Sequence, residues 1–413
     1  MGAVLAGSEW RRLPRKAEVR RLHTVISRFA IGYFLLFINF AVITPYLQVF
    51  LNLQGYGTIQ IGLLLGIFQM AGVAGPLLIG HLADRRSWYR PLLALSLVLC
   101  LAALIPLKLI FNPWIAAVIL AVFGLFFQPL VPLTDAIVTR NLADPAAQYG
   151  RARVFGSIGF VAMSLFIQAS GILSKPTTQT ILIASLASGG AFLIGMPLYP
   201  STKRERSAPV SLETRPADGA IDPLFWVGIA AIFLGRFGIT AHYSFFSLFL
   251  QQRLHIQSIS GLWAIGSIAE IPVILFGGTL LKRFRTEGLL ALSLLAISVR
   301  IFGYSLLPSL PVLIALQFLH ALTFGGLHMS AINLVNTYTS PSRRAMGMAI
   351  YAAVGNGIPA FIASALGGIV LQRWGFSTMF GLYSIFPLVG VALMPILHYR
   401  SMSRPTGGLR KGV

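Results

Sequence analysis

Twelve apolar runs, each long enough to cross a lipid bilayer, divide this chain of 413 residues. A single helical span needs roughly 20 apolar residues. The runs lie at about 24–46, 59–80, 91–110, 113–138, 152–173, 178–198, 223–250, 259–281, 288–307, 310–335, 346–370 and 377–397. Only 10% of the residues are charged, against about 25% in soluble domains. Unpaired backbone groups in hydrocarbon cost several kcal/mol, so the runs must be helical. The sequence therefore predicts an all-α integral membrane protein with twelve transmembrane helices.

The basic residues predict how these helices are oriented. The net charge of +21 would suit a nucleic-acid-binding protein if the charges shared one face, but 26 of the 32 lysines and arginines lie in the two terminal segments and in alternate gaps between the runs. The opposite gaps hold only Lys108, Lys175, Arg253 and Arg373. Basic residues mark the cytoplasmic side of a membrane protein. We therefore expect a multi-pass inner-membrane protein with both termini in the cytoplasm, and no nucleic-acid partner.

One long polar stretch separates the runs into two sets of six. We predict a cytoplasmic basic leader at 1–23, helical halves at 24–198 and 223–397, a cytoplasmic loop at 199–222 and a basic tail at 398–413. The leader has no apolar core before a cleavage site, so it is not read as a signal peptide. The two halves echo each other weakly, since GHLADR after the second run parallels GTLLKR after the eighth. Two parallel six-helix halves predict a transporter with its site between them.

The segment GHLADRR contains Gly80, Asp84, Arg85 and Arg86. It resembles the signature loop between helices 2 and 3 of the major facilitator superfamily. The resemblance implies a structural role, in which Asp84 pairs with arginines and locks the cytoplasmic gate. The alternative is an ordinary charged turn. In the second copy, Lys282 stands where an acid is expected, so the same pairing is not expected there.

Residues Tyr149–Phe160 (YGRARVFGSIGF) resemble the lactose permease-like branch of that superfamily, which includes the phenylpropionate permease group. The resemblance implies that Arg153 grips the substrate, that Phe160 stacks on it, and that Asp135, 18 residues before Arg153, supplies an acid. An Asp replaces the longer Glu of lactose permease, and a Phe replaces its Trp. These changes alter reach and hydrogen bonding, which disfavours a sugar substrate. The alternative is a surface ion pair between Asp135 and Arg153.

Glu270 lies near the middle of the eighth run and is the only acid within the runs of the second half. Charges inside a membrane usually face the bundle interior and are paired. Candidate partners at similar depth are Arg236, Arg300 and His320. We expect Glu270 to carry a coupling proton; the alternative is a permanently paired structural glutamate.

The run at Leu316–Ile332 resembles the phenylpropionate permease group closely, as do the residues around Glu270 and Arg300. The resemblance implies that His320 and Arg300 belong to a proton-coupling cluster. Lactose permease has a glutamate three residues beyond this histidine, whereas here the position is Thr323. Because threonine cannot carry a proton, we assign that role to Glu270.

The membrane interior also holds candidate substrate-binding residues, among which we count His320. Arg236, Arg300 and Arg153 favour an anionic, carboxylate-bearing solute, because the guanidinium fork suits a carboxylate. The same arginines could instead pair Glu270 and Asp135. Four further polar or aromatic residues could either line the cavity or join neighbouring helices: Tyr243, Trp263, His242 and His328. Glycine pairs such as Gly62 and Gly66 are typical of close helix crossings.

The sequence thus predicts a monomeric secondary transporter that carries a small organic solute with protons through the lipid bilayer. A carboxylate or aromatic acid is the favoured solute, moved by rocking of the two halves. The alternatives are a nucleoside or sugar symporter or an exporter of the same fold, and less so a channel, sensor or membrane enzyme. No phosphate-binding loop supports ATP-driven transport, and the single Cys100 supplies no cysteine metal site. We therefore expect neither a cofactor, a metal nor an enzymatic activity.

Overall fold

The computed structural model describes residues 16–199, 221–257 and 259–402, and these residues form helices joined by short turns. The α-helices are α1 (Lys16–Leu53), α2 (Thr58–Arg86), α3 (Tyr89–Leu109), α4 (Pro113–Phe127), α5 (Leu130–Asn141), α6 (Pro145–Ser170), α7 (Thr178–Gly195), α8 (Pro223–Leu248), α9 (Ile259–Leu306), α10 (Leu310–Gln317), α11 (Leu327–Tyr338), α12 (Arg344–Ile350), α13 (Ile358–Ala392) and α14 (Met394–Met402). Short 3-10 helices are η1 (Met196–Leu198) and η4 (Pro341–Arg343). Wider π-helical turns are η2 (Phe249–Arg253), η3 (Ala321–Gly326) and η5 (Tyr351–Gly357).

Ten of the described helical segments are long and apolar enough to cross a membrane. The predicted all-helical membrane fold is thus confirmed. Two long helices are interrupted: α9 has non-helical backbone at Arg285 (φ 57°, ψ 172°), and α13 at Gly375 (φ 78°, ψ 178°). The predicted central loop lies almost wholly outside the described residues, and so does most of the predicted basic tail. In the predicted leader, α1 already begins at Lys16.

Local sequence explains where several helices begin. Asn112 precedes α4 and accepts hydrogen bonds from the backbone N–H groups of Trp114 and Ile115. Asp222 does the same for Leu224 at the start of α8. In both helices a proline occupies the first helical position, where its missing N–H costs nothing. These caps fix helix starts in the turns, where the predicted apolar runs also begin.

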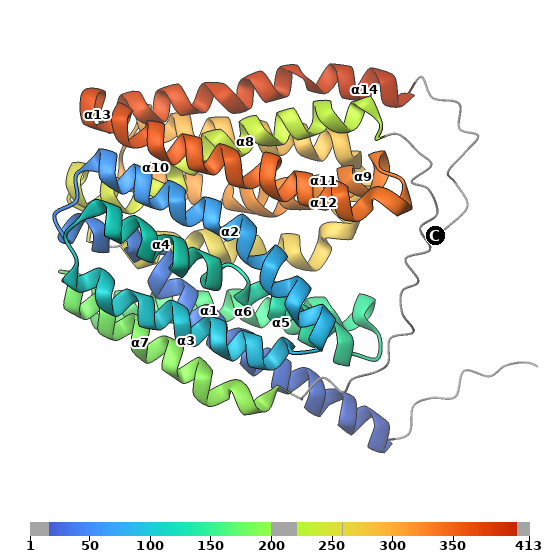
Figure 1. Cartoon of the computed structure of the whole chain (residues 1–413). Coiled ribbons are helices and arrows are strands. Elements are labelled where there is room, and N and C mark those ends of the chain that lie inside the picture. Colours follow the sequence, from blue (N-terminus) through green and yellow to red (C-terminus); the bar gives the residue numbers. More distant parts are fainter. Residues whose placement is uncertain (1–15, 200–220, 258, 403–413) are drawn as a thin grey trace, which may run out of the picture.

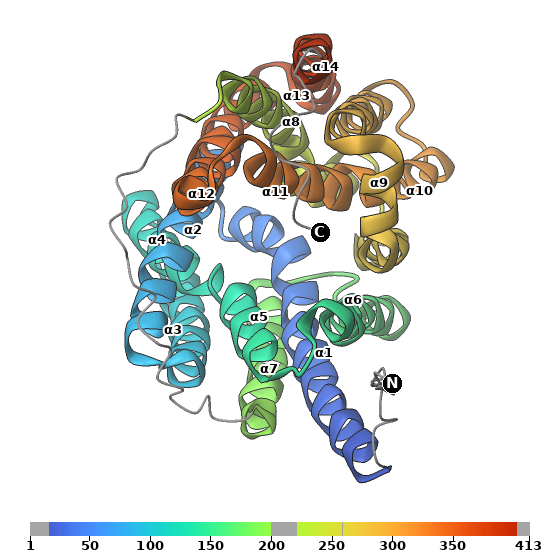
Figure 2. The ribbon, with the colours of Figure 1, turned by 90° about the vertical axis from the view of Figure 1, so that its right-hand side faces the viewer.

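The helices lie side by side as a bundle. α1 packs against α6 and α7, while α13 packs against α8, α9 and α2 (Figure 1). Figure 2 shows the bundle along its long direction, with α1, α3 and α7 on one side and α8, α13 and α14 on the other. The contact between α2 and α13 therefore joins the first half of the chain to the second.

We call one end of the bundle the closed end; it carries the turns at 54–57, 110–112 and 171–177. There Tyr46 Oη lies 2.7 Å from Ser260 Oγ, and Gln252 donates to Asn52 over 3.0 Å. Gln48, buried in α1, donates to the Tyr243 carbonyl (3.2 Å) and accepts from the Ser247 N–H (3.1 Å). Each of these bonds joins the C-terminal part of α1 to the second half of the chain. The two sets of helices are thus fastened together at the closed end.

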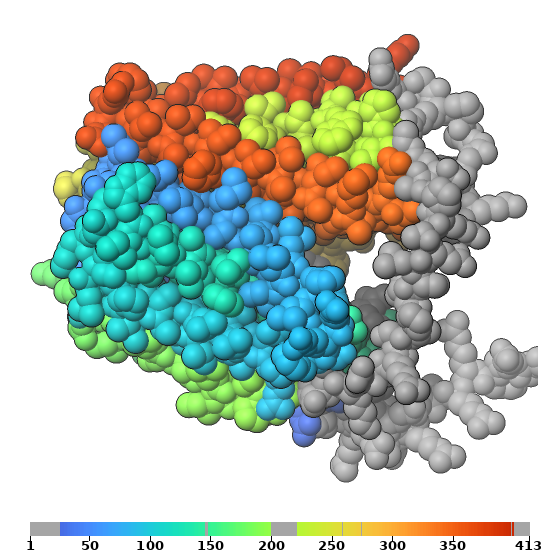
Figure 3. Space-filling view, viewed as in Figure 1, coloured from blue at the N-terminus to red at the C-terminus, as the bar shows by residue number. Residues whose placement is uncertain are grey.

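Glycines let α2 and α13 meet at the closed end. A Cβ on Gly62 would lie 2.3 Å from the Ser364 carbonyl oxygen, and one on Gly368 would lie 2.4 Å from that of Thr58. The prediction of a close helix crossing at Gly62 is therefore confirmed. Figure 3 shows the surfaces of α2 and α13 in contact, as this packing requires.

We predict that Gly62→Ala opens the closed end. The new methyl group meets backbone that cannot give way, and overpacking of this kind costs about 1–3 kcal/mol. The ratio of closed to open molecules should fall roughly 5- to 150-fold. Spin labels on cysteines replacing the exposed Leu53 and Arg253, in a Cys100→Ser background, would report a longer distance. Gly190→Ala in α7 is the control, because no atom lies within 4 Å of its Cβ position; an unchanged distance in Gly62→Ala would contradict the prediction.

Candidate functional site

The acid of the first half is held by tyrosines. Tyr33 in α1 donates its hydroxyl to Asp135 Oδ1 in α5 over 2.5 Å, and Tyr149 in α6 also hydrogen-bonds to this carboxylate. Among the described residues Asp135 forms no ion pair within 4 Å, so the ion pair with Arg153 that was the alternative interpretation is not present. The structure instead leaves the charge of Arg153 available.

Arg153 in α6 stacks on aromatic rings. Its guanidinium carbon lies 4.4 Å from the ring centre of Phe37 and 5.7 Å from that of Tyr33. Gly156, one turn later, makes room for this stack, because a Cβ there would lie 2.8 Å from Arg153 Nη1. That Nη1 is buried without a hydrogen-bond partner. Phe160, predicted to stack on the substrate, is 8% exposed and lies in the hydrophobic core.

A second unpaired guanidinium lies in α8. Arg236 and Tyr243 are seven residues apart and share a face of the helix, with the guanidinium 5.2 Å from the ring centre. Arg236 Nε and the Tyr243 hydroxyl are both buried, and neither has a hydrogen-bond partner. Arg236 also has no ion pair within the part of the chain that the structure describes. A buried cation without an anion is costly, so this pair is a strong candidate for binding an anionic group.

Arg300 in α9 is fully buried, and each of its five N–H groups has an acceptor. Nε–H points to the Tyr304 hydroxyl at 2.9 Å. The Nη1 partners are His320 Nδ1 at 3.2 Å and Thr323 Oγ1 at 2.9 Å. The Nη2 partners are His242 Nε2 at 3.2 Å and Gln317 Oε1 at 2.6 Å. Although Thr323 cannot carry a proton, it belongs to the network as an acceptor.

Glu270 joins this network through His320. Its Oε2 lies 3.7 Å from His320 Nε2, and both side chains are largely buried. Among the described residues, neither Arg236 nor Arg300 lies within 4 Å of the carboxylate. Of the three partners predicted for Glu270, the structure brings His320 into contact and leaves both arginines apart.

Gly266, one turn before Glu270 in α9, sets the distance between α9 and these side chains. A Cβ there would lie 3.3 Å from Gln317 Oε1 and 3.3 Å from His320 Cγ. We predict that Gly266→Ala displaces His320 from Glu270 and lowers the rate of solute transport roughly tenfold, because small misplacements of interacting groups are costly. Gly278→Ala in the same helix, with nothing within 4 Å, should transport normally. Equal rates in the two variants, measured in vesicles at equal protein content, would contradict the prediction.

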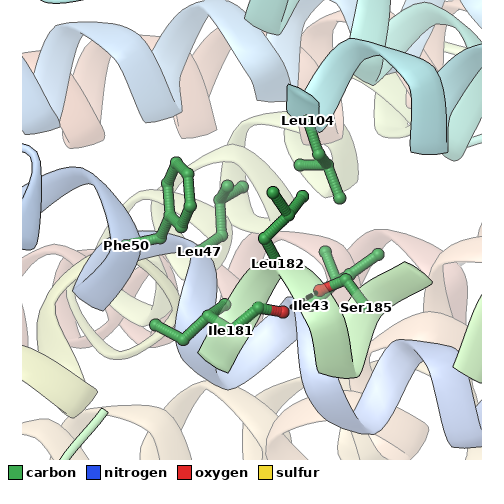
Figure 4. A pocket seen from close by; sticks show the side chains of 7 residues that line it. All are labelled: Ile43, Leu47, Phe50, Leu104, Ile181, Leu182 and Ser185. Carbon is green, nitrogen blue, oxygen red and sulfur yellow. Dashed lines mark hydrogen bonds between the residues drawn. The ribbon is translucent and has the colours of Figure 1, made fainter. Parts of the chain in front are cut away.

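A further pocket lies away from the polar network. Its walls come from α1, α3 and α7 and are almost wholly hydrocarbon (Figure 4). The lining residues are Ile43, Leu47, Phe50, Leu104, Ile181, Leu182 and Ser185. The Ser185 hydroxyl is already bonded to the Ile181 carbonyl at 2.9 Å. Without a charged group, this pocket does not suit a polar solute.

Residues 26–382 match the profile described as the MFS_1 like family, which covers most of the chain. The chain belongs to this family of major facilitator transporters.

Proteins similar to this family member are transporters rather than enzymes. A probable 3-phenylpropionic acid transporter of Escherichia coli (strain K12) is 28% identical over 91% of this chain and 97% of its own length. The maltose permease of Geobacillus stearothermophilus is 26% identical over 90% of this chain and 94% of its own length. The crystal structure of the nucleoside transporter NupG has a TM-score of 0.72 at 16% identity, and the match covers 92% of this chain and 100% of that one. The chain is thus a transporter and a multi-pass inner-membrane protein, with the predicted superfamily confirmed.

The predicted gate motif of this major facilitator lies at the end opposite the closed end. Asp84 Oδ1 accepts from Arg140 Nη2 over 3.1 Å, and Tyr89 donates to the same carboxylate. The Asp84 and Arg140 side chains are 64% and 48% exposed. Arg86 stacks on Trp88 at 4.8 Å rather than pairing with Asp84. All these partners belong to the first half of the chain, so Asp84 forms no described bond across the bundle.

In the second half of the chain, the acid nearest to the copied motif is Glu287, five residues after Lys282. Glu287 is buried, accepts from the Tyr338 hydroxyl over 2.9 Å, and lies 3.9 Å from Arg285 Nε. The sequence comparison of the halves aligned Lys282 with Asp84 and missed this acid five residues later. A search for the nearest carboxylate beyond the copied motif would have found Glu287.

Several site residues were missed, or left open, from the sequence. Tyr149 opens the motif at 149–160, but no role was assigned to it. Tyr33, Gln317 and Tyr304 carry no motif, although an uncharged polar residue in an apolar run is a usable signal. The role of His242 was left open by the sequence, and in the structure its Nε2 accepts a hydrogen bond from Arg300. The other two open cases form hydrogen-bond contacts between helical segments: Trp263 Nε1 donates to Ser247 (3.2 Å), and His328 Nδ1 lies 3.1 Å from the Tyr351 hydroxyl.

Proposed function

We propose that this transporter is a proton-coupled symporter of a small organic carboxylate. The observation that carries the proposal is Arg236, whose buried Nε has no hydrogen-bond partner and whose guanidinium has no described ion pair. Arg153 offers a second buried nitrogen without a partner. A substrate carboxylate would satisfy such a guanidinium through paired hydrogen bonds, with the unpartnered Tyr243 hydroxyl as a further donor.

The proton is assigned to Glu270, supported by its burial and its contact with His320. A buried carboxylate can exist neutral as well as ionised, and the change of charge alters its interaction with the surrounding helices. Arg300 and His320 position this carboxylate. The remaining predicted substrate residues, Asp135 and Phe160, support the first-half wall of the site rather than contact the carboxylate directly.

We also propose twelve membrane spans in two halves, 24–198 and 223–397. The breaks at Arg285 and Gly375 support this count, because each falls between two of the predicted apolar runs. The distribution of basic residues supports cytoplasmic termini. The closed end then faces the outside, and the structure represents an inward-facing state of a monomer that works by rocking its halves. The exposed, locally paired Asp84 agrees with an unlocked cytoplasmic gate.

An aromatic acid is the favoured solute. The similarity to a probable 3-phenylpropionic acid transporter supports this class. The rings of Phe324 and His328, stacked at 6.4 Å and more than a third exposed, add an aromatic wall to the second half. Sugar or nucleoside transport is the alternative within the same fold.

The direct test is uptake into proteoliposomes with an inside-alkaline pH gradient. We expect 3-phenylpropionate to enter faster than in protein-free liposomes, an uncoupler to abolish this additional uptake, and maltose and uridine not to enter. Accumulation that resists the uncoupler would refute symport. Uptake of maltose or uridine instead of the acid would establish the alternative solute class.

A further inference from the structure

The hydrogen bonds of Arg300 determine the protonation of the two histidines beside it. A guanidinium has five N–H donors and no acceptor. Every atom that receives one of these hydrogens must therefore offer a lone pair. His320 Nδ1 and His242 Nε2 occupy two of the five positions, each at 3.2 Å. Neither of these ring nitrogens can carry a proton while the network is intact, so both rings are neutral.

The remaining nitrogen of each ring must then bear the hydrogen. For His320 this is Nε2, which faces Glu270 Oε2 at 3.7 Å. For His242 it is Nδ1, which faces the Tyr304 hydroxyl at 3.4 Å. The Nε2–H of His320 is thus directed at the carboxylate, and the ring links the fixed charge of Arg300 to Glu270.

From this geometry we propose that His320 is a positioning residue held in its Nε2–H tautomer by Arg300, and that Glu270 alone takes up the transported proton. The proposal rests on the proton symport proposed above and specifies which group titrates. In each cycle a proton from water binds a Glu270 carboxylate oxygen, giving the neutral acid, and later leaves to the other side. No N–H bond of His320 forms or breaks.

The surroundings of His320 oppose its protonation. Adding a proton at Nδ1 would break the bond to Arg300 and place two positive groups in contact inside the membrane, where charge is costly. The other titratable groups that face this cluster are His242 and Tyr243 from α8, Tyr304 from α9, and His328 from α11. Among the described residues, Glu270 is the only acid in contact with the ring.

Glutamine is the test substitution for His320, because its amide group has both a hydrogen-bond acceptor and a donor, like the neutral ring. In His320→Gln the amide oxygen can accept from Arg300, and the amide N–H can donate to Glu270. We expect this variant to keep one proton per solute, the wild-type pH profile of uptake, and a half-saturating concentration within about threefold of wild type, as for a hydrogen bond exchanged for another. His320→Leu offers neither function and should lose coupled accumulation.

The outcomes separate this inference from the proposed function. If His320→Gln folds with normal thermal stability yet loses proton-driven accumulation while still exchanging solute, the ring itself carries the proton and the inference is wrong. If the wild-type protein moves no protons with its solute, the symport proposal fails first. Nitrogen-15 NMR of histidine-labelled protein gives an independent readout, since the signal absent from His320→Gln should be a neutral ring protonated at Nε2. An Nδ1-protonated or charged ring would overturn the inference.

Discussion

Glu270→Gln is expected to abolish proton-driven accumulation while solute still exchanges across the membrane. The amide can keep the contact with His320 but cannot bind a proton, so the solute would move only down its own gradient. One pH unit is worth about 1.4 kcal/mol and supports about tenfold accumulation at one proton per solute. In the variant, uptake in excess of that in protein-free liposomes should no longer depend on the imposed gradient. Counterflow of labelled against unlabelled solute, which needs no net proton movement, measures the retained exchange.

Glu287→Gln is the matched control for this prediction. Glu287 is the other buried glutamate of α9, and it accepts from Tyr338 at the end of the bundle opposite the closed end. Loss of this carboxylate should leave the accumulation ratio unchanged. Accumulation retained by Glu270→Gln, with its wild-type pH dependence, would show that another group carries the proton.

Much of the fold follows from apolar run length and the position of charges. The runs predicted a turn between 281 and 288 and another between 370 and 377, and the backbone breaks fall at Arg285 and Gly375. Only one residue in each helix has non-helical backbone angles, and α9 and α13 continue as helices on both sides of it. These turns could be predicted because basic or small residues interrupt the apolar pattern at both places.

The residues of the candidate site could be named from the sequence, but their contacts with one another could not. Asp135, Arg153 and Glu270 stand out because charge is rare inside the membrane. Their partners are distant in sequence: Tyr33 lies 102 residues before Asp135. Which partner a side chain meets depends on how each helix is rotated about its own axis. The wide turn η3, directly after His320, changes this rotation, and an apolar pattern alone does not reveal it.

Arg236→Gln is expected to weaken solute binding by roughly 100-fold, as measured by the half-saturating concentration for uptake. Removing one partner of a buried charged pair costs about 3–5 kcal/mol, and 1.4 kcal/mol corresponds to a factor of ten. Part of that cost is recovered here because glutamine can still donate one hydrogen bond. Arg236→Lys keeps the charge but loses the paired geometry, so about a tenfold rise is expected. Arg253→Gln, an exposed arginine at the closed end, should bind normally.

The charge of Arg236 can be tested separately from its packing by comparing an acid with its amide. Wild-type protein should bind 3-phenylpropionate much more tightly than the uncharged 3-phenylpropionamide, because only the acid neutralises the guanidinium. In Arg236→Gln this preference should nearly vanish, since the variant offers no charge for either ligand to meet. If the variant weakens both ligands equally and keeps the preference for the acid, Arg236 supports the helix packing of α8 and the carboxylate is bound elsewhere. Arg153, with its own unpartnered nitrogen, is then the residue to which the same comparison applies.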